Sequence, residues 1–97
     1  MLSQVNYLIR SKVDGKYLVA RLQEEEQTKE ANYLLLFKED YEALSYINTH
    51  GADLRDRLSV ESISPPQLKG LLQRWGYKGI GLVEDPLIPK IRFMSQE

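Results

Sequence analysis

The sequence predicts an α/β fold of the α+β type: a mixed sheet of five to six strands with two helices on one face. The expected element order is β-β-β-α-β-α-β, extended by a last strand. Three observations predict this fold: the turn signal Asp14-Gly15, the apolar run at 33–37, and two segments with helical periodicity that carry capping residues. The 97 residues, 42% of them hydrophobic and 28% charged, suffice for one core and predict a single domain, residues 1–97.

The first two predicted strands, residues 5–12 and 16–22, form a hairpin around Asp14-Gly15. Asp-Gly is a strong signal for a two-residue turn, which would pair Val13 with Lys16. Opposite pairs then alternate between the two faces of the sheet, and one face is mostly apolar. The other face, which we call the mixed hairpin face, carries Leu8, Arg10, Lys12, Tyr17, Val19 and Arg21.

A polar loop at 23–30, a central strand and the first helix follow. Residues 33–37 are apolar at every position, which is typical of a strand buried on both sides. Residues 39–49 predict an amphipathic helix that ends at Gly51. Its expected buried stripe comprises Tyr41, Leu44 and Ile47, with Ala43 beside them.

The second helix follows a short strand at 58–63 and has the most specific local signature in the chain. Ser64 is the expected N-cap, Pro65 takes the first helical position, and Gln67 completes a capping box. Gly76 is expected to end the helix. Four apolar residues recur at i, i+3, i+4 and i+7, so we expect all of them to be buried: Leu68, Leu71, Leu72 and Trp75.

The C-terminal segment predicts a buried strand at 79–83 and a last strand at 88–94, separated by Asp85-Pro86. Pro89 would confine the last strand to a sheet edge. We expect both helices on one face, because helices on both faces would bury Arg10 and Arg21.

Two segments are similar to the N-terminal domain of the SseB-type (enhanced serine sensitivity) family. Residues 35–44, Leu-Leu-Phe-Lys-Glu-Asp-Tyr-Glu-Ala-Leu, resemble its strand-to-helix entry, and residues 79–86, Gly-Ile-Gly-Leu-Val-Glu-Asp-Pro, resemble a later strand. The charged loop 51–57 departs from the family pattern. The resemblance implies a small bacterial α/β domain without an established enzymatic activity, and it supplies no functional residues.

Composition excludes several classes of function. Thirteen Lys and Arg against fourteen Asp and Glu give a net charge of −1, unlike a generally basic nucleic-acid binder. The absence of cysteine excludes disulfide scaffolds, thiol catalysis and Cys-ligated zinc. The N-terminus has no long apolar segment, and the longest apolar run is residues 33–37. We therefore expect no signal peptide, no membrane association and a cytoplasmic location.

Candidate chemical sites are few. His50 could be a general base, but a helix C-terminus favours a cation for structural reasons, and no triad motif accompanies it. The glycines of 76–81 follow a helix, whereas a phosphate-binding loop precedes one. The loop carboxylates have no calcium-binding pattern: Asp53, Asp56, Glu84 and Asp85. We expect no enzyme, no catalytic residue, no cofactor and no metal.

The mixed hairpin face is the remaining candidate site. It has three interpretations: an ordinary solvated face, an amphipathic patch for a protein partner, or a basic surface for nucleic acid. Its single aromatic residue, Tyr17, argues against the last, because stacking platforms usually offer two or three. We expect a small protein-interaction module that uses this face or an exposed strand edge. The alternative is a nucleic-acid-binding protein, and an enzyme using His50 comes third.

Overall fold

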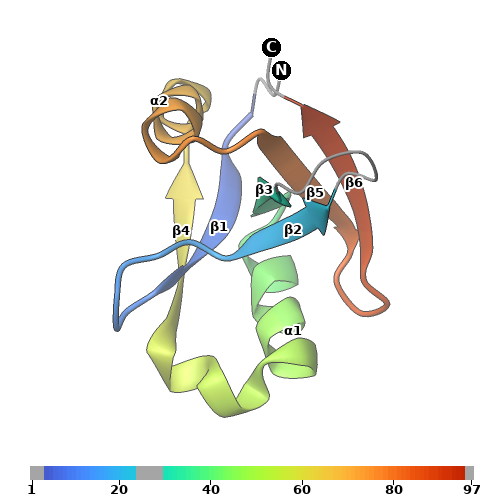
Figure 1. Ribbon diagram of the computed structural model, residues 1–97. Helices are drawn as coiled ribbons and strands as arrows, with labels where there is room; N and C mark the ends of the chain where they lie inside the picture. The colour runs from blue at the N-terminus through green and yellow to red at the C-terminus, as the bar shows by residue number, and fades with distance from the viewer. Residues whose placement is uncertain (1–3, 24–29, 96–97) are drawn as a thin grey trace.

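The computed structural model of the protein describes residues 4–23 and 30–95 (Figure 1). It confirms the α+β class, the mixed sheet of six strands and the predicted element order. The elements are β1 (Asn6–Ser11), β2 (Val19–Gln23), β3 (Glu30–Phe37), α1 (Asp40–His50), the 3-10 helix η1 (Ala52–Arg57), β4 (Leu58–Ile63), α2 (Pro65–Trp75), β5 (Gly79–Asp85) and β6 (Lys90–Ser95). Most of the predicted polar loop, residues 24–29, lies outside the described residues.

The apolar strand β3 is the centre of the sheet, as predicted. The strand order is β4-β1-β3-β5-β6, and β2 also pairs with β3. One edge of β3 is shared, because β2 pairs with residues 30–34 and β1 meets the strand at Phe37. The other edge pairs in parallel with β5. Strands β4 and β6 therefore form the two ends of this order, and the edge position predicted for the last strand is confirmed.

The loop of the hairpin is longer than the two residues predicted. Arg10 pairs with Tyr17, and the Ser11 N–H donates to the Lys16 carbonyl at 2.8 Å, so residues 12–15 form a four-residue loop. The Asp14 carboxylate accepts the Lys16 N–H at 3.0 Å, a side-chain contact that favours this wider loop. The predicted register was therefore wrong. The predicted ladder was wrong as well: in the described residues the two arms of the hairpin share the single bridge Arg10–Tyr17, and β2 pairs along its length with β3. Because the register shift is even, the strand residues keep the faces to which they were assigned, whereas Lys12 lies in the loop.

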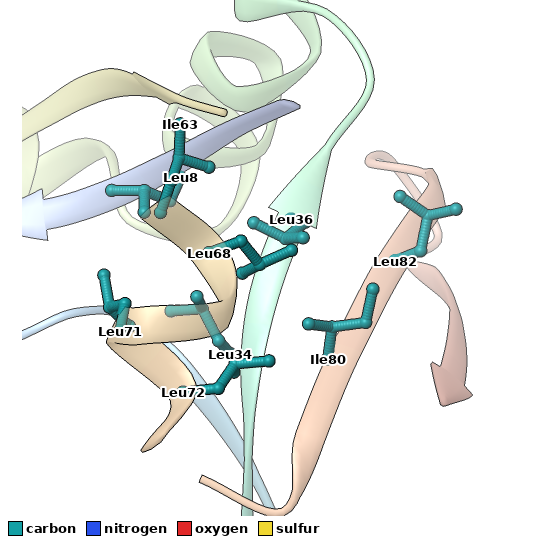
Figure 2. Close-up of a cluster of buried hydrophobic side chains, with 9 residues drawn as sticks. All are labelled: Leu8, Leu34, Leu36, Ile63, Leu68, Leu71, Leu72, Ile80 and Leu82. Carbon is teal, nitrogen blue, oxygen red and sulfur yellow. The ribbon is translucent and has the colours of Figure 1, made fainter. Parts of the chain in front are cut away.

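The two helices lie on opposite faces of the sheet, so the prediction of one shared face was wrong. Leu34 and Leu36 of β3 pack with α2, whereas the alternate residues Leu35 and Phe37 pack with α1. Figure 2 shows the cluster beneath α2. The expectation failed because α2 covers only part of its face: Arg21 is exposed, and the Arg10 side chain keeps 40% of its surface exposed.

Helix α2 begins and ends as predicted. The Gln67 N–H donates to Ser64 Oγ and the Ser64 N–H donates to Gln67 Oε1, which completes the capping box. Gly76 has a left-handed φ of 68°, and the Tyr77 N–H donates to the Leu72 carbonyl at 3.0 Å, a Schellman arrangement. Leu68, Leu71 and Leu72 are buried, but Trp75 is 44% exposed, which corrects the expected burial.

The buried stripe of α1 also differs from the prediction. Ala43 and Ile47 are buried, whereas Tyr41 and Leu44 are 63% and 50% exposed. Tyr46 packs beside Phe37 instead, with ring centres 5.4 Å apart. The helix carries two overlapping apolar stripes, and periodicity alone does not decide which of them meets the sheet. None of the helices in the described ranges is long and apolar enough to cross a membrane.

Candidate ligand-binding cleft

A cleft of about 420 Å³ lies between β4 and α2. Glu61 pairs with Leu8 across the sheet, so both residues face the α2 side of the two strands. The α2 residues of the cleft recur every three to four positions and therefore share one side of the helix. The apolar lining is Leu8, Tyr17, Ile63 and Leu71. The polar lining is Glu61, Ser62, Gln67 and Arg74, and Gly70 completes the wall.

Arg10 is fixed at the hairpin end of the cleft by three contacts. Its Nε donates to the Gly15 carbonyl at 3.0 Å, and its guanidinium Cζ lies 5.0 Å from the centre of the Tyr17 ring. Its Nη1 lies 3.8 Å from Glu61 Oε1. Ser59 Oγ lies 3.4 Å from the other Glu61 oxygen. Both ends of the ion pair are about 40% exposed, so the pair positions the two side chains more than it stabilises the fold.

A row of aromatic rings continues from Tyr17 around the end of α2. The ring centre of Tyr17 lies 5.3 Å from that of Trp75, edge to face, and Trp75 stacks on Tyr77 at 6.1 Å. Burial and the neighbouring Tyr17 raise the pKa of the Tyr77 hydroxyl. Since Trp75 is 44% exposed, the row presents an accessible indole beside the cleft.

The structure divides the mixed hairpin face. Leu8 and Tyr17 line the cleft, and Arg10 lies beside them. Leu8 is only 2% exposed, and Val19 packs against the α2 cluster, so these two residues belong to the core as much as to a surface. Lys12 and Arg21 are exposed and lie outside the cleft lining.

The cleft also contains residues that sequence reasoning missed. Arg74 lines it, and its guanidinium makes no hydrogen bond or ion pair with any residue in the described ranges. Gly70 lines it from the middle of a helix, where glycine costs about 1 kcal/mol relative to alanine. That unfavourable glycine is the signal that could have drawn attention to this side of α2. Nothing local in the sequence marks Arg74 or Glu61.

Strand β4 places an unpaired edge beside the cleft. All six β4 residues, Leu58–Ile63, pair with β1 along one edge. No described strand pairs with the opposite edge, because β4 stands at the end of the sheet order. Such an edge presents backbone N–H and C=O groups that accept an added strand.

His50 lies at the C-terminal end of α1, on the other face of the molecule. Its Nε2 is 2.9 Å from the Pro86 carbonyl oxygen, and its ring centre is 4.8 Å from that of Tyr46. It borders a smaller cavity of about 150 Å³. These contacts show no acid partner for the imidazole in the described part of the chain.

The predicted loop carboxylates do not converge. Asp85 Oδ1 accepts the Leu87 N–H within the turn after β5, and Asp53 and Asp56 lie exposed on η1. Within residues 4–23 and 30–95, no three His, Cys, Asp or Glu side chains are grouped to hold a metal ion. The β4–α2 cleft is therefore the site at which we develop a function.

Comparison with known proteins assigns no family. No protein-family model matches the chain, and no match was found among curated proteins or solved structures. The resemblance to the SseB-type domain stays a prediction. The functional interpretation of the cleft depends on its own geometry.

Proposed function

We propose that the protein is a binding module that holds a segment of a partner protein in the β4–α2 cleft. One observation carries the proposal: a cleft lined by both polar and apolar residues lies beside an edge of β4 with which no described strand pairs. Its volume of about 420 Å³ is in the range of ligand sites, and its mixed lining fits a peptide, which offers both hydrogen-bonding groups and apolar side chains.

The ionisable groups of the cleft support binding rather than catalysis. Glu61 is shared between Arg10 and Ser59, and the lining includes no His. A general base needs a free position for the proton that it takes up, and a nucleophile needs an adjacent base.

We expect the module to act in the cytoplasm, because a chain without cysteine needs no oxidising compartment.

The proposal is tested by selecting a phage-displayed library of random decapeptides on the immobilised protein. The parent should enrich a consensus sequence. Gly70→Leu should lose binding of the enriched peptides, because a leucine there projects into the cleft. Lys69→Leu is the matched control, since Lys69 is exposed on the same helix and does not line the cleft. A library that enriches no consensus, or a consensus indifferent to Gly70→Leu, would contradict the proposal.

Binding of a single-stranded nucleic acid is the second candidate function. The observation that favours it is the row of Tyr17, Trp75 and Tyr77, which supplies the aromatic residues that the sequence did not place together. Base stacking on such rings contributes about 1–3 kcal/mol per base. An oligo-uridine titration at increasing salt tests it: phosphate contacts predict a steep fall of affinity with salt, and Trp75→Ala should weaken binding further.

The peptide ranks first because part of the aromatic surface is already covered by neighbouring side chains. Arg10 covers one face of Tyr17, and Trp75 stacks on Tyr77. The chain also lacks an excess of positive charge to hold a phosphate backbone.

A further inference from the structure

Building on the proposed function, we propose that the occupant of the cleft is an extended, acidic peptide segment. The segment adds as a strand to the free edge of β4 and places a carboxylate on Arg74. Three independent features of the described residues carry this assignment: the β4 edge, the unpaired guanidinium and the glycine in the wall of α2.

The β4 edge specifies the conformation of the occupant. Strand β4 ends at Ile63 and the chain enters α2 through Ser64, so the helix and the strand edge adjoin the same cleft. In an added strand, successive side chains point to opposite faces. Alternate side chains would therefore enter the cleft over Ile63 and Leu71, while the backbone pairs with β4.

Arg74 specifies the charge of the occupant. The carboxylate of Glu61 already faces Arg10 at 3.8 Å and Ser59 at 3.4 Å. Arg74 has no such partner among the described residues, so the uncompensated charge of the cleft is positive. A guanidinium binds a carboxylate through two parallel hydrogen bonds, which gives geometry as well as attraction. An acidic residue of the peptide fits this position.

Gly70 keeps the middle of the cleft open. Its φ is not positive, and a Cβ built on it would meet no atom within 4 Å. Neither backbone strain nor packing in this structure requires glycine at that position. The missing side chain leaves space for a peptide to approach the helix closely.

The test combines the decapeptide selection with a charge reversal. The parent should enrich peptides that share an Asp or Glu at one position, and Arg74→Glu should weaken these peptides by about tenfold or more. Arg74→Gln is the second variant and should also weaken them. Lys69→Glu is the control: it makes the same charge change on α2, outside the cleft lining, and should keep the acidic preference. Thermal unfolding of each variant checks that it folds.

Backbone pairing is tested on a synthetic copy of the enriched peptide. N-methylation of its amides one at a time should weaken binding by about tenfold at alternate positions and little between them. The protein could enrich peptides whose binding Gly70→Leu abolishes, but which share no acidic residue or show no alternation in the N-methylation scan. That result would overturn this inference and leave the proposed function standing. Absence of any cleft-dependent peptide, or binding of oligo-uridine alone, overturns both.

Discussion

Trp75 and Leu72 lie close together on α2, but the structure gives them different roles. Leu72 is fully buried in the α2 cluster, whereas Trp75 is 44% exposed and contacts Tyr17 and Tyr77. Leu72→Ala should therefore lower the free energy of unfolding by about 2–5 kcal/mol. Trp75→Ala should lower it by only about 1–2 kcal/mol, the scale of an aromatic contact with partial burial. Urea unfolding of both variants compares them, and equal losses would mean that Trp75 is a core residue.

Asp14 links the hairpin loop to acid stability. The backbone N–H of Lys16, and then the Ser11 hydroxyl, hold the pKa of the Asp14 carboxyl below its usual value. A carboxyl whose pKa is lowered by folding stabilises the fold above its unfolded pKa of about 4, and this contribution is lost as the pH falls through the folded pKa. Asp14→Asn should therefore reduce the fall of stability below about pH 4. Unfolding curves between pH 7 and pH 2.5 measure it, and parallel pH profiles for parent and variant would contradict it.

Single residues also show where sequence reasoning was sufficient and where it was not. The left-handed Gly76 was predictable because a helix end of this kind strongly favours glycine. The exposure of Trp75 was not, because its i+7 spacing fits a buried stripe equally well. The i+7 spacing predicts the side of α2 on which Trp75 lies. How much of the Trp75 side chain is covered depends on the hairpin, which supplies Tyr17 as its neighbour.

At the scale of elements, the N-terminus of α2 gives the clearest quantitative expectation. Ser64 Oγ accepts the Gln67 N–H, one of the helix donors that has no partner within the helix. Ser64→Ala should therefore lower the free energy of unfolding by about 1 kcal/mol. Ser64→Asp is the matched control, because aspartate also accepts this hydrogen bond, and it should retain most of the stability. Denaturant midpoints measure the difference, and a Ser64→Ala midpoint equal to the parent's would show that the capping box contributes nothing.

Elements that are marked by local sequence signals were predicted accurately. Elements for which two local arrangements compete were not. The bounds of β4 and the caps of α2 agree with the sequence, since capping and turn residues act within a few positions. The hairpin loop differs because side-chain contacts of Ser11 and Asp14 stabilise a wider turn than Asp-Gly favours by itself. The stripe of α1 differs because Tyr41 and Leu44 compete with Ala43 and Tyr46 for contact with the sheet, while the predicted burial of Ile47 is confirmed.

At the scale of the whole molecule, the candidate site is a product of topology. Leu8, Tyr17, Ile63 and Leu71 come from four separate segments, and the cleft exists only where the sheet brings them together. The sequence predicted half of this set through the alternation of the hairpin. The rest depends on which face α2 covers. The sequence predicted both helices on the face opposite Arg10 and Arg21. This was wrong because a short helix covers only part of a sheet of six strands and leaves room for exposed arginines beside it.

The whole-molecule view also predicts a conflict between stability and binding at Gly70. Gly70→Ala adds a methyl group that meets no atom and removes the entropic cost of a glycine within a helix, so the variant should gain up to about 1 kcal/mol of stability. The same methyl group narrows the cleft, so the variant should bind the enriched decapeptides more weakly than the parent. Gln73→Ala is the control on the exposed side of α2 and should leave binding unchanged. Urea unfolding and peptide titration of both variants separate the two effects. A Gly70→Ala protein that gains stability and keeps its full affinity would show that the glycine is not retained for the ligand.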